Sequence, residues 1–129
     1  MDLAETRLPV QQPLSVVLVE DDQALLGALA FALRIEGYEI YPYSSAEELL
    51  AEGLPSGPVC LVIDQGLPGM TGLDLVEILR EQGTTTPAIL ITGRLKREVE
   101  LRVARVFQAV VNKPLLGNSL TEAISKALS

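Results

Sequence analysis

Three short segments of this chain are apolar at almost every position: Ser15–Val19, Val59–Ile63 and Ala88–Ile91. Each has the length of a strand and ends at polar or turn-forming residues. A strand that is apolar on both sides has to be covered on both faces, which is the environment of a central strand in a parallel sheet. These segments therefore predict a buried parallel sheet, and this constrains the fold more than any other feature of the sequence.

Segments with helical periodicity separate the strands. We expect helices over residues 23–36, 46–51 (capped by Ser44 or Ser45), 72–82 and 95–106, and a closing helix marked by Leu120, Ile124 and Leu128. Two further strands are expected at Glu39–Tyr43 and Ala109–Val111. Five strands that alternate with helices predict an α/β fold, a doubly wound parallel five-stranded sheet with helices on both faces.

The composition belongs to a single globular domain and argues against several classes of function. The chain has 129 residues, and no apolar run approaches the ~20 residues that a membrane span needs. Met1–Pro13 lacks the basic start and apolar stretch of a signal peptide. We therefore expect a flexible segment over residues 1–13, one domain over 14–129 and a cytoplasmic location, without membrane insertion. The net charge of −7 argues against direct binding to nucleic acid.

The supply of metal ligands is limited to oxygen atoms. Cys60 is the only cysteine and the chain has no histidine. A disulfide within the chain and a thiolate metal cluster are therefore excluded, and Cys60 is expected to be buried and inert. A metal site in this chain has to use carboxylates and carbonyl oxygens, which favours Mg²⁺.

Polar residues follow four of the predicted strands. Glu20 and Asp21 follow the first, Asp64 the third, Thr92 the fourth and Lys113 the fifth. In an open parallel sheet the ligand site lies beyond the carboxyl ends of the strands. We therefore expect three carboxylates, one hydroxyl and one ammonium group to meet in one cleft. Asp22, in contrast, is expected to cap the first helix.

Three carboxylates in one cleft repel one another unless a cation lies between them. We expect Mg²⁺ to be held directly by Asp21 and Asp64, through water by Glu20, and by the backbone carbonyl of Gly66. Asp64 can then act as a carboxylate nucleophile and accept a phosphoryl group as an acyl phosphate.

The remaining groups suit the charge of a phosphoryl group. Its transfer depends mostly on positioning and on stabilising charge on the equatorial oxygens. The metal would hold one oxygen, the ammonium of Lys113 a second, and the hydroxyl of Thr92 or a loop amide the third.

The segments VVLVEDD, LVIDQGLPGMTGLDL, ILITG and VVNKPL occur in this order. Over about residues 15–128 they resemble the receiver domain of bacterial two-component response regulators. The resemblance implies the flavodoxin-like (βα)5 fold with strand order 2-1-3-4-5 and a cis Lys113–Pro114 bond. It also implies transfer of a phosphoryl group to Asp64 from a histidine kinase or a histidine phosphotransfer protein. Because the chain ends with its fifth helix, we expect a stand-alone, chemotaxis-type receiver that docks on an unknown downstream protein or relays phosphoryl groups.

Some positions depart from the family pattern. Receivers usually carry an aromatic residue three positions before the strand-end lysine, and here that residue is Val110. Valine cannot make the large rotamer change of an aromatic ring, so the usual threonine–aromatic switch is in question, whereas the phosphorylation chemistry is not. Phe107-Gln108 stands where a Gly-Ala pair is common, which predicts a tighter or remodelled connection into the fifth strand.

Gly66 and Arg94 lie two residues past Asp64 and Thr92, beside the route of an attacking water. They are therefore expected to tune dephosphorylation, with Gly66 leaving the site open and Arg94 covering it or holding the phosphoryl group.

Five of the ten basic residues fall between positions 94 and 105: Arg94, Lys96, Arg97, Arg102 and Arg105. A solvated helix face with local ion pairs to Glu98 and Glu100 and a partner-binding surface are equally compatible with this cluster. Oligomeric state stays open between a monomer and a weak homodimer.

Two other functions remain as alternatives. The first is a receiver-like interaction module that works without phosphorylation, for which Val110 is the main argument. The second is an enzyme. Phosphatases with an Asp nucleophile carry a second Asp two residues later, where this chain has Gly66. We therefore expect the chain to catalyse only its own phosphorylation and dephosphorylation. An FMN site is disfavoured because Glu20, Asp21 and Asp22 would repel a phosphate.

Overall fold

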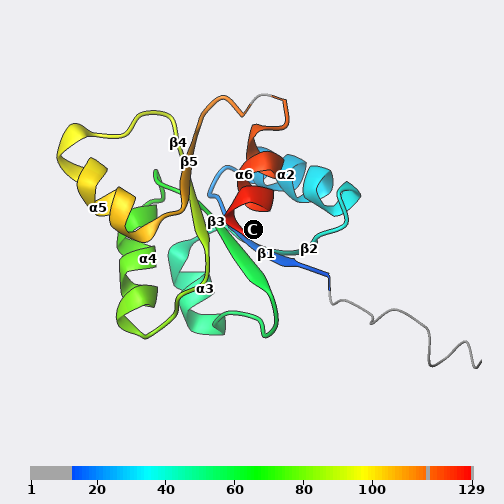
Figure 1. Ribbon diagram of the computed structural model, residues 1–129, viewed down its shortest axis with the longest axis horizontal. Helices are drawn as coiled ribbons and strands as arrows, with labels where there is room; N and C mark the ends of the chain where they lie inside the picture. The colour runs from blue at the N-terminus through cyan, green and yellow to red at the C-terminus, as the bar shows by residue number, and fades with distance from the viewer. Residues whose placement is uncertain (1–12, 116, 129) are drawn as a thin grey trace, which may run out of the picture.

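The computed structural model of the chain describes residues 13–115 and 117–128, and five parallel strands within them form one sheet in the order β2-β1-β3-β4-β5 (Figure 1). The strands are β1 (Ser15–Val19), β2 (Glu39–Tyr43), β3 (Val59–Asp64), β4 (Ala88–Thr92) and β5 (Ala109–Asn112). Both the flavodoxin-like architecture and the strand order agree with the sequence prediction. The N-terminal segment expected to be flexible lies, except for Pro13, outside the described residues.

Helices cover both faces of this sheet, and each face has its own core. The helices are α2 (Gln23–Ile35), α3 (Ala46–Glu52), α4 (Gly72–Glu81), the short 3₁₀ helix η1 (Arg97–Val99), α5 (Glu100–Val106) and α6 (Ser119–Ala127). One core packs α2 and α6 against one side of the strands, and the other packs α3, α4 and α5 against the opposite side (Figure 1). Residues of β1, β3 and β4 alternate between the two cores, which explains why these strands are apolar throughout.

The ends of α2 show how local sequence sets the helix boundaries. The side chain of Asp22 accepts a hydrogen bond from the backbone N–H of Leu25 at 3.1 Å, which confirms the predicted cap. At the other end Gly37 adopts a φ of 99°, and the N–H groups of Gly37 and Tyr38 donate to carbonyls of the last turn. This is the glycine-terminated arrangement that ends many helices. Of the two serines proposed to cap α3, Ser45 does so, through the N–H of Glu48.

The helix predicted over residues 95–106 is wrong at its start. Residues 93–96 form a loop, Arg97–Val99 is 3₁₀ helix, and the α-helix begins only at Glu100. Leu95 packs against the core from the loop, so its spacing to Val99 and Val103 imitates a helical repeat. Neither η1 nor α5 has a side-chain cap at its start. In α6 the periodicity also ran one residue too far, because Leu128 follows the helix and is 40% exposed.

Phe107 and Gln108 connect α5 to β5 through specific contacts. Phe107 is 7% exposed and belongs to the core beneath α4 and α5. Gln108 donates its backbone N–H to the carbonyl of Ala88 at 2.9 Å, and its side-chain oxygen accepts the N–H of Ala88 at 2.6 Å. The two hydrogen bonds between Gln108 and Ala88 therefore fix where β5 joins β4.

Among the described residues, no helix has the length and apolar character needed to cross a membrane.

Candidate functional site

Three carboxylates meet at the carboxyl ends of β1 and β3. The register pairs Val19 with Ile63, so the residues that follow, Glu20 and Asp64, come to the same level at the sheet edge. Glu20, Asp21 and Asp64 each offer an oxygen within 4.8 Å of the others. Glu20 is 1% exposed and Asp64 3% exposed, whereas Asp21 is open to solvent. The sequence prediction that these three residues converge is confirmed.

Lys113 joins this cluster from the end of β5. Its Nζ lies 3.1 Å from Oδ1 of Asp64 and 3.2 Å from Oε1 of Glu20. Its backbone N–H donates to the carbonyl of Thr92 at 2.9 Å, which holds the start of the following loop against β4. The next peptide bond, Lys113–Pro114, is cis, as the resemblance implies.

The environment of Glu20 is unfavourable to its charge. Burial and the neighbouring charge of Asp64 raise the pKa of Glu20 above its ordinary value, against the opposing effects of a backbone hydrogen bond from Asp22 and of Lys113. Its Oε2 accepts the N–H of Asp22 at 3.2 Å. Its buried Oε1 has no hydrogen bond of acceptable geometry within the described residues, although Lys113 is close enough to form an ion pair. Glu20 therefore carries an oxygen that lacks a hydrogen-bond partner.

Lys113 is held as a cation by the same cluster. Burial alone would lower the pKa of Lys113, but the hydrogen bond to Asp64 and the negative charges of Asp64 and Glu20 outweigh it and raise the pKa. Lys113 compensates only one of the three carboxylates, so two net negative charges remain when all four groups are ionised.

These residues fit a divalent hard cation. The excess negative charge, the buried oxygen of Glu20 without a hydrogen bond, and a donor set made only of oxygens all match Mg²⁺. A Cβ at Gly66 would lie 3.7 Å from Oδ2 of Asp64, so glycine leaves more room beside this carboxylate than any other residue. The backbone carbonyl of Gly66 as a ligand stays a prediction.

Thr92 reaches the same edge of the sheet from β4, the strand between β3 and β5. It is 3% exposed and pairs with Asn112 of β5. Its position agrees with the prediction, and its role in binding a phosphoryl oxygen remains a prediction.

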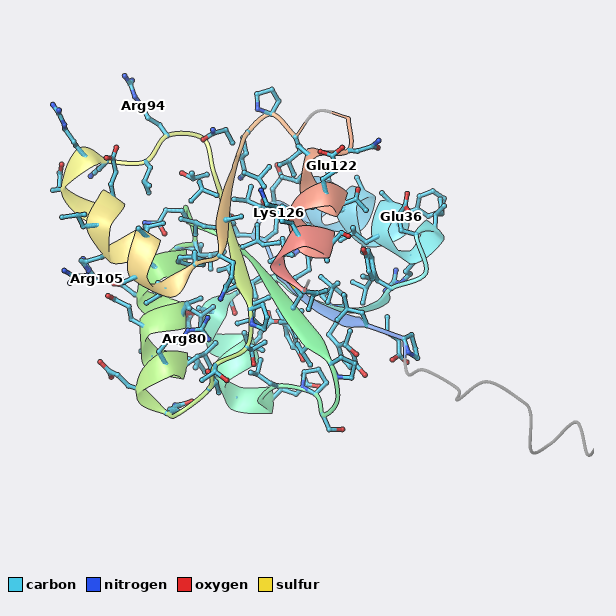
Figure 2. The ribbon with its side chains drawn as sticks, in the orientation of Figure 1. Glu36, Arg80, Arg94, Arg105, Glu122 and Lys126 are labelled. Carbon is cyan, nitrogen blue, oxygen red and sulfur yellow. The ribbon has the colours of Figure 1, made fainter. Side chains whose placement is uncertain are left out.

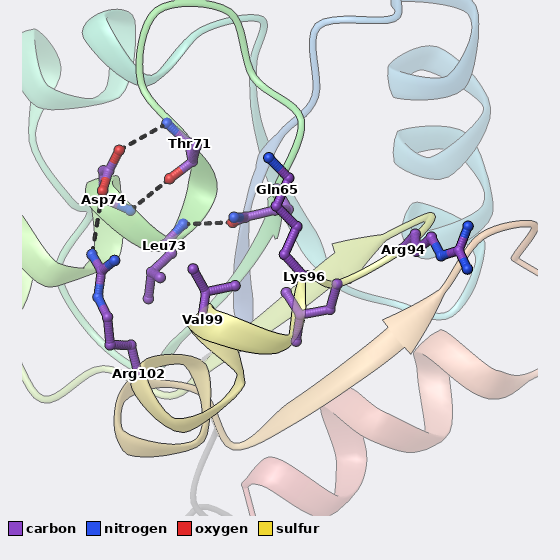
Figure 3. A pocket seen from close by; sticks show the side chains of 9 residues that line it. Gln65, Thr71, Leu73, Asp74, Arg94, Lys96, Val99 and Arg102 are labelled. Carbon is purple, nitrogen blue, oxygen red and sulfur yellow. Dashed lines mark hydrogen bonds and ion pairs between the residues drawn. The ribbon is translucent and has the colours of Figure 1, made fainter.

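The three residues predicted to tune or transmit the response, Gly66, Arg94 and Val110, are all exposed. Val110 is 40% exposed on β5, at the level of Leu90 in β4. Arg94 is exposed, and it forms no ion pair with another described residue. Figure 2 shows its side chain extending away from the loop that carries it, and Figure 3 shows its guanidinium pointing away from Thr71 and Asp74.

The contacts of Gln65 were not foreseen. This residue follows Asp64, and its backbone N–H donates to the carbonyl of Ile91 at 2.8 Å. Its backbone carbonyl accepts the N–H of Gly72 at 3.2 Å, and its side-chain oxygen accepts the N–H of Leu73 at 2.8 Å (Figure 3). Gln65 therefore ties the site to β4 and to the first turn of α4. A single glutamine in a loop gives no sequence signal for these contacts.

The backbone of Gly72 also lies close to Asp64. A Cβ at Gly72 would lie 2.5 Å from the backbone carbonyl oxygen of Asp64 and 3.0 Å from Cγ2 of Ile63. The helix that follows is fixed by a capping box in which Thr71 and Asp74 bond to each other's backbone N–H. The start of α4 is thus packed directly against the backbone of Asp64.

The ion pairs of the basic cluster differ from those expected. Instead of pairing with the nearby Glu98 or Glu100, Arg102 reaches across to α4. Its Nε lies 3.2 Å from Oε2 of Glu77, and its guanidinium is 3.6 Å from Oδ1 of Asp74. The cluster therefore joins α5 to α4 at one point, while the other four basic residues form no ion pair with any described residue.

Comparison with known proteins agrees with this fold. A family model described as the response regulator receiver domain matches residues 16–125. Sensory transduction protein RegX3 of Mycolicibacterium smegmatis is 40% identical over 80 residues, which cover 62% of this chain and 35% of that protein. Nodulation protein W of Bradyrhizobium diazoefficiens is 32% identical over 113 residues, which cover 87% of this chain and 50% of that protein. The chain thus spans half or less of the length of these curated relatives.

Solved structures give the same result. A CheY-like response regulator receiver domain protein from Methanospirillum hungatei JF-1 superposes with a TM-score of 0.83 at 27% identity, over 91% of this chain and 94% of that chain. The response regulator protein TrrA from Thermotoga maritima, in complex with Mg²⁺ and BeF, gives a TM-score of 0.77 over 88% of this chain and 97% of that chain. At 24% identity the second likeness is one of fold alone.

Proposed function

The chain belongs to the receiver domain family of response regulators. We propose that it accepts a phosphoryl group on Asp64 in a Mg²⁺-dependent reaction. We further propose that it signals by altered partner binding or by relay of the phosphoryl group. The observation that carries the proposal is the placement of the Asp64 carboxylate. It is buried, lies 3.1 Å from the ammonium of Lys113, and sits within reach of two further carboxylates.

Each residue of the site has its own role in the proposed phosphoryl transfer. An oxygen of Asp64 attacks phosphorus and becomes the bridging oxygen of an acyl phosphate. Lys113, already in contact with this carboxylate, is placed to neutralise one phosphoryl oxygen, and the hydroxyl of Thr92 to donate to another. Glu20, Asp21 and Asp64, with the Gly66 carbonyl, would hold Mg²⁺, which supplies positive charge for the attacking carboxylate and the phosphoryl oxygens.

We propose a histidine kinase or a histidine phosphotransfer protein as the donor. The new P–O bond forms at Asp64 while the P–N bond of the phosphohistidine breaks, and the released imidazole takes up a proton. The matched relatives include a sensory transduction protein and a nodulation protein, which together with the receiver family supports a place in two-component signalling. With Gly66 two positions after Asp64, the chain lacks the second aspartate of phosphatases, and we propose that it turns over no external substrate.

The further proposals concern the setting in which this domain acts. We propose a cytoplasmic receiver, monomeric or weakly dimeric, which docks on an unidentified downstream protein and does not bind nucleic acid directly. The alternative is an interaction module that works without phosphorylation. It is favoured by Val110, which is 40% exposed and has no ring to turn inward.

Intact-protein mass spectrometry after incubation with acetyl phosphate distinguishes the phosphorylated receiver from the module that works without phosphorylation. We expect wild type to gain one phosphoryl group with Mg²⁺ and none with EDTA. Asp64→Asn should gain none in either condition, whereas Asp22→Asn, which changes the neighbouring helix cap, should gain one with Mg²⁺. If wild type and Asp64→Asn give the same masses with Mg²⁺, the receiver reaction is refuted and the phosphorylation-independent alternative takes its place.

A further inference from the structure

Gln65 stands where the strand that carries Asp64 turns towards α4. Its backbone N–H donates to the carbonyl of Ile91 at 2.8 Å, which extends the pairing of β3 with β4 by one residue. Its backbone carbonyl accepts the N–H of Gly72 at 3.2 Å, and its side-chain Oε1 accepts the N–H of Leu73 at 2.8 Å (Figure 3). One residue is therefore hydrogen-bonded to both β4 and α4.

The two bonds to α4 satisfy backbone groups that a helix cannot satisfy by itself. The first N–H groups of an α-helix have no carbonyl partner within the helix. Gln65 accepts those of Gly72 and Leu73, the first two residues of α4. The side chain of Thr71 accepts the next one, from Asp74, at 3.1 Å. Because Leu73 is 1% exposed, loss of the Gln65 oxygen would leave a buried donor without a partner.

The loop that these bonds close lies against the proposed metal site. Gly66 is its first residue, and a Cβ there would lie 3.7 Å from Oδ2 of Asp64 and 4.0 Å from Oδ1. Gly66 is exposed and has no side chain, so its backbone is held by its neighbours. These are Leu67, which is buried in the core, and Gln65, which is bonded to α4. The place of the Gly66 carbonyl therefore depends on both.

We propose that Gln65 is a positioning residue for the metal, and that its side-chain bond to α4 holds the Gly66 carbonyl where Mg²⁺ takes it as a ligand. The inference rests on the proposed function and deepens its Mg²⁺-dependent part. The side chain of Gln65 is not itself a ligand, because its oxygen is bonded to the N–H of Leu73. Mg²⁺ demands near-ideal octahedral geometry, so a small displacement of one carbonyl weakens its binding.

The variant Gln65→Met tests this role, because methionine has nearly the length of glutamine and no amide oxygen. In Mg²⁺ titrations followed by amide chemical shifts, its Kd should be about tenfold higher than that of wild type, the low end of the effect of groups that orient a metal ligand. Thr71→Val is the matched control. It also removes one side-chain bond to the first turn of α4, but it leaves the bond from Gln65 in place. It should bind Mg²⁺ as tightly as wild type.

The variant Gln65→Glu is the rescue, because a glutamate oxygen has the same reach as the amide oxygen that it replaces. It should restore the slow hydrogen exchange of the Leu73 amide that Gln65→Met loses, and it should bind Mg²⁺ at least as tightly as wild type. Phosphorylation by acetyl phosphate gives a second readout. Gln65→Met should raise the half-saturating Mg²⁺ concentration by the same factor as Kd and leave the rate at saturating Mg²⁺ unchanged.

Three results would overturn the inference and leave the proposed function intact. The first is an equal Kd for wild type and Gln65→Met. The second is an equal loss of Mg²⁺ binding in Gln65→Met and Thr71→Val, which would make Gln65 a helix cap and nothing more. The third is a lower rate at saturating Mg²⁺ with no change in the half-saturating concentration. A wild type that binds no Mg²⁺ would overturn the inference and the Mg²⁺-dependent reaction together.

Discussion

The packing of α4 against the backbone of Asp64 leads to a prediction about Gly72→Ala. The new Cβ would lie 2.5 Å from the carbonyl oxygen of Asp64, and real Cβ contacts below 3.0 Å essentially do not occur. Either the end of β3 or the start of α4 therefore has to move by at least 0.5 Å, the difference between these distances. The neighbouring atom belongs to the backbone, so no flexible side chain can absorb the shift.

The cost of such overpacking is about 1–3 kcal/mol. Alanine offsets little of it, because Gly72 is the first residue of α4 and the gain in helix propensity is smaller there than in a helix interior. Gly27→Ala is the matched control. Gly27 lies inside α2, is exposed, and its added Cβ would meet nothing within 4 Å. It should stabilise the fold by about 0.5–1 kcal/mol.

Urea denaturation followed by circular dichroism separates the two variants. With a slope of about 2 kcal/mol per molar urea, Gly72→Ala should lower the midpoint by about 0.5–1.5 M, and Gly27→Ala should raise it slightly. Gly72→Ala should also slow phosphorylation by acetyl phosphate, because the displaced backbone is that of Asp64. Equal midpoints for Gly72→Ala and Gly27→Ala would refute the close packing of α4 on Asp64.

Three further predictions concern buried groups. Burial raises the pKa of the Cys60 thiol to about 12, so native protein should resist a thiol reagent that labels it fully in urea, and rapid labelling without urea would be the contrary result. Because the pKa of Glu20 is raised above 4.5, the stability contributed by its protonation is complete below that pH and is lost as pH rises through the folded-state pKa. Glu20→Gln should therefore stabilise EDTA-treated protein at neutral pH but not near pH 4.5, and it should also weaken Mg²⁺ binding. Equal shifts of the urea midpoint at both pH values would contradict the raised pKa of Glu20. Phe107→Ala should cost about 3–5 kcal/mol by urea denaturation, whereas Phe31→Ala, at a position that is 66% exposed, should cost far less, and similar losses would show that Phe107 is not part of the core.

The fold and most of the site could be predicted because they depend on simple rules. Strands apolar on both faces have to be central, and the carboxyl ends of parallel strands have to share an edge. These two rules are enough to bring Glu20, Asp21, Asp64 and Lys113 together. They hold for any sequence with this alternation, so no knowledge of side-chain packing is needed.

The remaining features depend on packing in three dimensions. Leu95 has the spacing of a helical residue, but it contacts the core from a loop, and periodicity alone does not distinguish the two. Arg102 finds its partners on α4 rather than four residues away on its own helix. The close approach of Gly72 to Asp64 joins residues of a strand and a helix whose relative position no local pattern specifies.

The identity of the phosphorylated residue tests the central claim most directly. An acyl phosphate can be trapped by borohydride reduction, which converts the modified aspartate to homoserine, and tandem mass spectrometry then locates the converted residue. After treatment with acetyl phosphate and Mg²⁺, we predict conversion at Asp64 and no conversion at Glu20 or Asp21. Conversion at another carboxylate, or none at any position under conditions that phosphorylate a known receiver domain, would contradict the role assigned to Asp64.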